Sequence, residues 1–190
     1  MDLVVGEATP DYVFHPHVPG RVKRLIPDVK LIVVLRDPVD RAFSHYWHQV
    51  ERGYEPLSFD EAIRREDERL AGELERMLQD ETYLSFPRHH HSYVTRGRYA
   101  EQLEWWLALF PREQLAFVDG RALFESTGDA SRELQAFLGV PHRDLGPFPR
   151  YNAYTAGEMS PGTRAALVER FRGPNERLYE LAGRDYGWAR

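Results

Sequence analysis

The 190-residue sequence contains no cysteine, which excludes disulfide bonds and thiolate chemistry and is compatible with a reducing compartment. It also contains no apolar run near the roughly 18 residues that a membrane-spanning helix needs, and its N-terminus has no signal-peptide pattern. Basic residues are not in excess either, because the formal net charge is −5. We therefore expect neither a membrane nor a nucleic acid among the partners of this chain.

A glycine-rich phosphate-binding loop is also missing. Such a loop follows a strand and turns consecutive backbone amides toward one anion. Gly6 stands alone after two valines, and Gly157 and Gly162 follow no apolar strand. A nucleotide-kinase-like phosphotransferase requires a loop of this kind, so this class ranks last among the functions considered.

The residues that are present describe a globular α/β protein. Hydrophobic residues make up 42% of the chain and aromatic residues 13%, which is typical of a chain with a packed core. Short apolar runs that alternate with helical patterns predict a parallel sheet flanked by helices in a single domain over residues 1–190. The predicted strands are 3–5, 31–35 and 115–118, and the predicted helices are 18–26, 38–51, 58–79, 95–109, 129–138 and a last region from 160 that Gly173-Pro174 interrupts.

The most informative segment runs from Lys30 to Ser44. Five apolar, mostly β-branched residues predict a buried strand, which ends at Arg36. Asp37 is a suitable helix N-cap, and Pro38 fits the first helical position, where no amide donor is needed. An arginine at a helix N-terminus predicts a site for phosphate or sulfate. The alternative for Arg36 is a surface salt bridge to a neighbouring aspartate.

The sequence of residues 35–46 resembles the 3′-phosphate-binding segment of sulfotransferases that use 3′-phosphoadenosine 5′-phosphosulfate. It reads Leu-Arg-Asp-Pro-Val-Asp-Arg-Ala-Phe-Ser-His-Tyr. The resemblance is closest to the bacterial and heparan-sulfate-type branch and covers nearly the whole chain. It is also carried by residues 6–10, 96–103, 174–179 and 183–188. It implies a fold like that of P-loop NTPases, in which Arg36 and Ser44 hold the 3′-phosphate.

The resemblance implies an enzyme that transfers a sulfuryl group from this donor to a hydroxyl or amine, leaving 3′,5′-adenosine bisphosphate. The acceptor is expected to be a small molecule, a carbohydrate or a lipid, since acceptor loops vary. The rival interpretation is a non-catalytic protein that binds the nucleotide or a partner. Golgi members of the family carry a membrane anchor, which this sequence lacks, so we expect a cytoplasmic bacterial protein.

The family also has an N-terminal strand, loop and helix that grip the 5′-phosphosulfate, and this sequence has no counterpart of them. The resemblance therefore implies that the chain is the C-terminal part of an incomplete fold. We expect a homo-oligomer or a preceding segment to cover the exposed sheet edge. The family's glutamate base would lie before Met1, and Ala8 stands where a helping lysine is found, so no catalytic residue is assigned.

Three other groups are candidates for the site. Arg150 stands where related enzymes place a basic loop over the nucleotide, which makes it a candidate phosphate contact; an exposed loop arginine is equally compatible with the sequence. Glu7 is either an acid or base near the nucleotide or a structural hydrogen-bond acceptor. The run from His89 to His91 suggests a metal, but consecutive histidines rarely face one ion, so no metal is predicted.

Overall fold

The structure is a computed structural model that describes residues 4–148 and 157–188. Its contacts group the chain into two compact units, and each is described separately. The first unit contains described residues up to 36 and from 106 to 148, and the second contains residues 37–105 and 157–188. The single domain expected over 1–190 stays a prediction.

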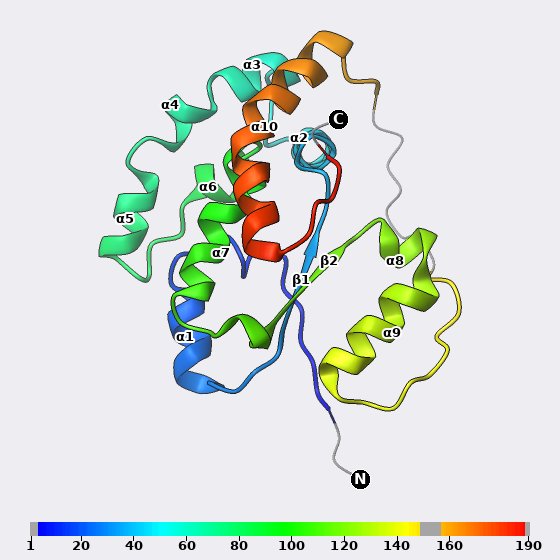
Figure 1. Cartoon of the computed structure of the whole chain (residues 1–190). Helices are drawn as coiled ribbons and strands as arrows, with labels where there is room; N and C mark the ends of the chain where they lie inside the picture. The colour runs from blue at the N-terminus through cyan, green and yellow to red at the C-terminus, as the bar shows by residue number, and fades with distance from the viewer. Residues whose placement is uncertain (1–3, 149–156, 189–190) are drawn as a thin grey trace. The chain divides into compact units, whose positions relative to one another are not determined.

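The first unit contains a two-stranded parallel sheet. Strands β1 (Leu31–Leu35) and β2 (Leu115–Asp119) lie side by side, and the register joins Leu31 to Leu115 and Leu35 to Asp119 (Figure 1). Parallel pairing requires a long crossover between the strands, which the intervening helices supply. On one side of the sheet, α1 (Val18–Leu25) contributes to a cluster around buried residues of α7, β2 and the turn between them. The members of this cluster are Trp106, Phe110 and Leu115.

Two strand predictions need correction. Val4 and Val5 are in no strand and are 60% and 88% exposed, while Leu3 lies outside the described residues. Strand β1 is present as predicted, but it is not buried on both faces, because Ile32 and Val34 are 40% and 55% exposed. A run of apolar residues cannot distinguish a strand covered on both faces from one covered on a single face, since coverage depends on distant segments.

Beyond β2, the first unit continues into α8 (Ala122–Glu125) and α9 (Thr127–Leu138). The predicted end of this helix at residue 138 is confirmed, because Gly139 follows it with a left-handed φ of 77°. The predicted start is wrong by two residues. Asp129 lies inside the first turn and pairs with Arg132 at 2.8 Å, so it does not cap the helix.

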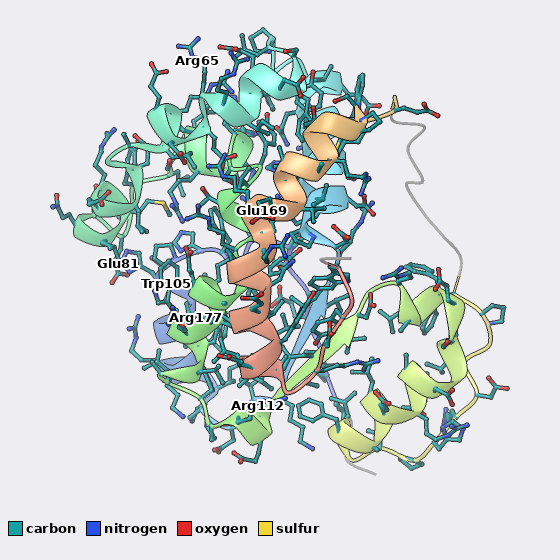
Figure 2. The ribbon with its side chains drawn as sticks, turned by 45° about the horizontal axis from the view of Figure 1, so that its top comes forward. Arg65, Glu81, Trp105, Arg112, Glu169 and Arg177 are labelled. Carbon is teal, nitrogen blue, oxygen red and sulfur yellow. The ribbon has the colours of Figure 1, made fainter. Side chains whose placement is uncertain are left out.

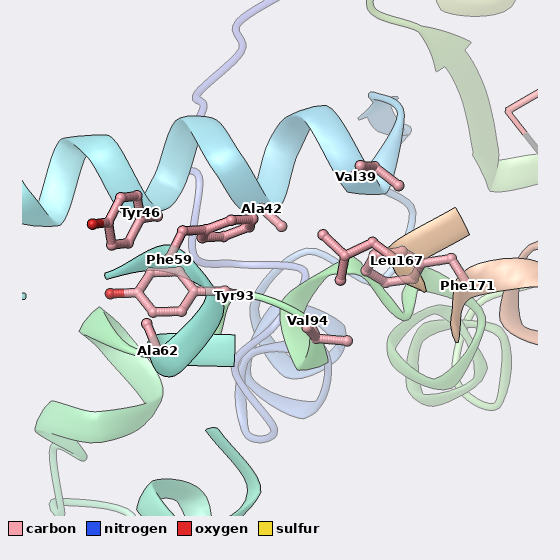
Figure 3. Close-up of a cluster of buried hydrophobic side chains, with 9 residues drawn as sticks. All are labelled: Val39, Ala42, Tyr46, Phe59, Ala62, Tyr93, Val94, Leu167 and Phe171. Atoms are coloured by element: carbon pink, nitrogen blue, oxygen red, sulfur yellow. The ribbon is translucent and has the colours of Figure 1, made fainter. Parts of the chain in front are cut away.

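The second unit is built around α2 (Pro38–Glu51) and α10 (Pro161–Ala182), which pack against each other. The apolar residues of α2 recur at helical spacing, and the buried ones among them belong to a core cluster of this unit (Figure 3). That cluster consists of Val39, Ala42, Tyr46, Phe59, Ala62, Tyr93, Val94, Leu167 and Phe171.

The helix predicted over 58–79 is instead three short helices. These are α3 (Phe59–Arg64), α4 (Glu66–Leu70) and α5 (Glu73–Gln79). Ser58 caps the first of them, because its hydroxyl accepts a hydrogen bond from the Glu61 amide at 3.4 Å. The chain leaves helical geometry at Arg65 and again at Ala71 and Gly72, and Gly72 adopts a left-handed φ of 75° before α5 begins.

The remaining elements follow α5 along the chain. Helix α6 (Phe86–His90) precedes a 3₁₀ turn, η1 (Thr95–Gly97), and α7 (Tyr99–Leu107); a second 3₁₀ turn, η2 (Arg112–Gln114), precedes β2. The helix predicted over 95–109 is therefore a 3₁₀ turn followed by a shorter helix. Among the described residues, no helix is both long enough and apolar enough to cross a membrane.

Helix α10 is continuous, so the predicted interruption at Gly173-Pro174 is wrong (Figure 1). Proline removes one backbone hydrogen bond and usually bends or breaks a helix. Here the residues on both sides of Pro174 are buried in one stripe, and their packing holds the helix together. The stripe consists of Leu167, Phe171, Asn175, Leu178 and Ala182.

Candidate functional site

The candidate site begins where β1 ends. Arg36 is exposed directly after the last residue of the strand. Asp37 then caps α2 as predicted, because its Oδ1 accepts hydrogen bonds from the amides of Val39 at 2.8 Å and Asp40 at 3.3 Å. Pro38 occupies the first helical position, also as predicted.

The same cap corrects the predicted use of the helix N-terminus. The amides of Val39 and Asp40 already donate to the Asp37 carboxylate, so they are not directed at an external anion. Burial and the neighbouring Asp40 charge raise the pKa of Asp37. Two acidic side chains at this helix start make its field unfavourable to a further anion. Any anion recognition here must therefore come from side-chain donors.

Ser44 lies on α2 eight residues after Arg36 and is half-buried. It is about 9 Å along the helix from Pro38 at 1.5 Å per residue. Asp40 and Arg41 stand one turn before it on neighbouring rows of the helix surface. Asp40 pairs with Arg164 of α10 at 2.6 Å, and Arg41 donates to the Tyr93 carbonyl. Both neighbours of Ser44 are therefore used to hold α2 in its unit.

Gly97 packs tightly against Pro38, the first residue of α2, and against Phe171. A Cβ added at Gly97 would lie 2.8 Å from two ring atoms of Phe171 and 3.1 Å from the Cβ of Pro38. The turn that carries Gly97 is anchored by Glu66, whose buried carboxylate accepts from the amides of Val94 and Thr95, both at 2.7 Å. The resemblance included Gly97 in a matching block, but its packing role could not be read from the sequence.

The other candidate residues do not gather at one place. Glu7 is exposed and accepts a hydrogen bond from Thr9 at 2.8 Å, in agreement with its structural interpretation. His90 bonds to Gln49 at 2.8 Å and His91 to the Tyr54 carbonyl at 3.1 Å, so these rings face different partners. Within residues 4–148 and 157–188, no three potential ligands are grouped to hold a metal. Arg150 lies outside the described residues.

A buried polar network near the α2 core was missed by the sequence reasoning. Glu55 accepts from both terminal nitrogens of Arg69, at 2.5 and 3.1 Å, and from the Tyr93 hydroxyl at 2.8 Å. Its side chain is fully buried. Glu55 and Tyr93 are 38 residues apart, so no local pattern brings them together. The network positions Tyr93, whose carbonyl in turn holds Arg41.

An open groove of about 390 Å³ lies between α3 and α10. Its lining includes Arg64 and Arg170, but each is already paired, with Glu61 at 2.5 Å and with Asp67 at 3.2 Å. Figure 2 shows how densely the outer surface of α10 carries charged side chains, among them Glu169 and Arg177. None of the predicted site residues lines the groove.

His45, next to Ser44, gives a pH-dependent prediction. Its ring packs on Tyr93 with centroids 5.1 Å apart, and its Nδ1 has no hydrogen-bond partner in the described part of the chain. Burial, followed by the charges of Arg41 and Arg96, lowers the pKa of His45 to about 2. The folded ring stays neutral, whereas the unfolded ring takes up a proton below pH 6.5. Stability is therefore lost as the pH falls.

We expect His45 alone to reduce the free energy of unfolding by about 1 kcal/mol between pH 7 and pH 5.5. Urea unfolding at both pH values should show a smaller pH effect for His45→Phe than for the unchanged chain. His142→Phe, at an exposed position, is the control and should keep the full effect. An equal pH effect in His45→Phe and the unchanged chain would contradict the neutral, buried ring.

Comparison with known proteins agrees with the architecture. Residues 10–150 match the family model of the sulfotransferase domain. The crystal structure of a sulfotransferase from Alicyclobacillus acidocaldarius superposes with a TM-score of 0.74 and 35% sequence identity, over 97% of this chain and 67% of that chain. The predicted α/β fold is thus the fold of a solved sulfotransferase.

Two curated relatives point the same way. The membrane-associated sulfotransferase kil1 of Dictyostelium discoideum is 27% identical, over 97% of this chain and 53% of its own length. Heparan sulfate glucosamine 3-O-sulfotransferase 3B1 of Mus musculus is 29% identical, over 97% of this chain and 50% of its own length. The chain spans about half the length of these relatives. It belongs to the sulfotransferase family, a family of transferase enzymes.

Proposed function

We propose that this chain binds 3′-phosphoadenosine 5′-phosphosulfate and takes part in the transfer of its sulfuryl group to a hydroxyl or amine acceptor. One observation carries the proposal: residues 35–46 lie inside the matched sulfotransferase domain and form a strand end, an arginine and a capped helix start. In this proposal Arg36 and Ser44 bind the 3′-phosphate. Arg150 is proposed as a further phosphate contact.

The chemistry explains why these side chains matter. In the reaction the acceptor oxygen or nitrogen bonds to sulfur and gives up its proton to a base, the bond from sulfur to the 5′-phosphate oxygen breaks, and 3′,5′-adenosine bisphosphate leaves. Such transfers depend on positioning and on neutralising charge. An arginine at the end of a strand has a fixed backbone origin, and its planar guanidinium can donate two parallel hydrogen bonds to a phosphate. Arg36 would thereby fix the nucleotide at its 3′ end.

The acceptor class belongs to the proposal as well. The mouse relative is named for heparan sulfate glucosamine, so a carbohydrate is the first acceptor to test, followed by small-molecule and lipid hydroxyls. The cytoplasmic and bacterial origin expected from the sequence stays a prediction, and one relative is described as membrane-associated.

Nucleotide binding tests the proposal directly. Isothermal titration should show that Arg36→Ala binds 3′,5′-adenosine bisphosphate about 30-fold more weakly than the unchanged chain, because charge-assisted bonds are lost. Affinity for adenosine 5′-monophosphate, which has no 3′-phosphate, should not change. Arg132→Ala removes an exposed arginine on α9 and is the matched control. Unchanged affinity of Arg36→Ala for the bisphosphate would refute the assignment.

A non-catalytic nucleotide-binding protein is the second candidate, because the sequence contains no glycine-rich loop for the 5′-phosphosulfate. A transfer assay with sulfur-35-labelled donor and pooled acceptors separates the two. Labelled product indicates an enzyme. Nucleotide binding without labelled product indicates the second candidate.

A further inference from the structure

The carboxyl ends of β1 and β2 bring two arginines to the same edge of the sheet. The strands are in register to their last residues, Leu35 and Asp119. One further bond extends the pairing, because the Gly120 amide donates to the Leu35 carbonyl at 2.6 Å. Arg36 follows Leu35 directly and Arg121 follows Gly120, so the two arginines leave neighbouring strands at the same edge, with Arg121 one residue further along than the position in register with Arg36. Both belong to the first unit.

Gly120 makes this approach close. A Cβ added at residue 120 would lie 3.0 Å from the Leu35 carbonyl oxygen and 3.3 Å from a methyl carbon of Val34. Only a residue without a side chain lets the two backbones meet at this distance without adjustment. The backbone of Arg121 is then fixed by a hydrogen bond from its amide to Asp119 Oδ1 at 2.9 Å.

The Arg121 side chain remains able to bind an anion. It is 56% exposed, and its ion pair with Asp119 is long, at 3.9 Å. Exposed pairs of this kind contribute little free energy, so a phosphate can compete for the guanidinium. Arg36 and Arg121 are the positive side chains at the ends of the two strands, where Asp119 is negative. Asp37 and Asp40 at the start of α2 oppose an anion, so its recognition depends on both guanidinium groups.

A phosphate monoester carries nearly two negative charges at neutral pH, and Arg36 can neutralise only one of them. We infer that Arg121 supplies the second cation and donates to an oxygen of the same 3′-phosphate. Ligands of open α/β sheets gather at the carboxyl ends of the strands, which is where both arginines stand. The inference rests on the proposed function and adds a residue that selects for the 3′-phosphate.

The test compares two nucleotides on one set of variants. Arg121→Ala should bind 3′,5′-adenosine bisphosphate about tenfold more weakly, with unchanged affinity for adenosine 5′-monophosphate. Arg121→Lys keeps the positive charge but not the planar guanidinium. Its affinity for the bisphosphate should therefore lie between that of the unchanged chain and that of Arg121→Ala. Arg132 on α9 has a similarly exposed side chain, 62%, and also pairs with an aspartate, so Arg132→Ala is the control.

The outcomes separate this inference from the proposed function. If Arg36→Ala weakens bisphosphate binding and Arg121→Ala behaves like Arg132→Ala, the inference fails and the function stands. If the unchanged chain does not prefer the bisphosphate over the monophosphate, the proposed function fails first. If Arg121→Ala lowered the affinity for both nucleotides by the same factor, the assignment of Arg121 to the 3′-phosphate would be overturned.

Discussion

Replacing Arg69 with methionine is expected to lower the free energy of unfolding at pH 7 by about 3–5 kcal/mol. The substitution leaves the Glu55 carboxylate buried without its cation. Burial by itself raises the pKa of Glu55, but the Arg69 guanidinium, the Leu57 amide and the Tyr93 hydroxyl outweigh it, so the net shift is downward. The pair thus stabilises the fold above the unfolded pKa of Glu55, and that stability is lost as the pH falls through the folded pKa.

The pH dependence distinguishes this mechanism from simple loss of packing. In Arg69→Met the buried Glu55 should protonate more readily, so the deficit should shrink between pH 7 and pH 5. Adding Glu55→Gln should restore much of the lost stability, because no buried charge then remains. Urea unfolding of the two variants measures both effects. A deficit that stays constant with pH and survives in the double variant would contradict the prediction.

Arg65 provides the control on the same surface. Its guanidinium pairs with Glu68 at 3.2 Å, and its side chain is 47% exposed (Figure 2). Exposed ion pairs contribute little because water and salt screen them, so Arg65→Met should leave the free energy of unfolding nearly unchanged. A large effect in this control would show that methionine itself disturbs the helices.

Gly97→Ala is the second large change, with an expected loss of about 2–3 kcal/mol in the free energy of unfolding. Its methyl group would need space that the Phe171 ring and Pro38 already occupy. Phe171 is fully buried, so its ring has little freedom to move. Displacement of Pro38 would shift the start of α2, and therefore bisphosphate binding should weaken along with stability.

Gly173→Ala is the matched control for Gly97→Ala. Gly173 lies inside α10, and a Cβ there would meet nothing within 4 Å. Alanine in an exposed helix interior is favoured over glycine by about 1 kcal/mol, but the following Pro174 disfavours helical geometry in a residue that carries a Cβ. The two effects oppose each other, so this variant should change stability far less than Gly97→Ala. Thermal unfolding and isothermal titration of both variants test the difference. Wild-type stability in Gly97→Ala would show that the turn can move away at no cost.

The local features of the candidate site could be predicted because they depend on short-range chemistry. The end of β1, the Asp37 cap and Pro38 at the first helical position all follow from neighbouring residues. The roles of Arg36 and Ser44 came from the family resemblance and stay predictions. The occupied amides of α2 could have been anticipated, because a capping aspartate uses the donors that an anion would need.

The long-range features could not be predicted from one sequence. The continuity of α10 across Pro174 depends on burial of residues such as Phe171 against segments more than 100 residues away. The Glu55 network joins three separate segments, and the placement of Arg36 and Arg121 at one sheet edge depends on the pairing of β1 with β2, which no local pattern encodes. The break at Gly72 had a visible signal, a glycine in a helical pattern, that was not used.

Helix α10 contacts three helices that are far from it in sequence. Arg164 pairs with Asp40 of α2, Thr163 donates to Asp60 of α3, and Arg170 pairs with Asp67 of α4. A short helix such as α3 or α4 has little stability of its own. Detachment of α10 would therefore release these helices together, so that the second unit opens in one cooperative step instead of by piecemeal fraying.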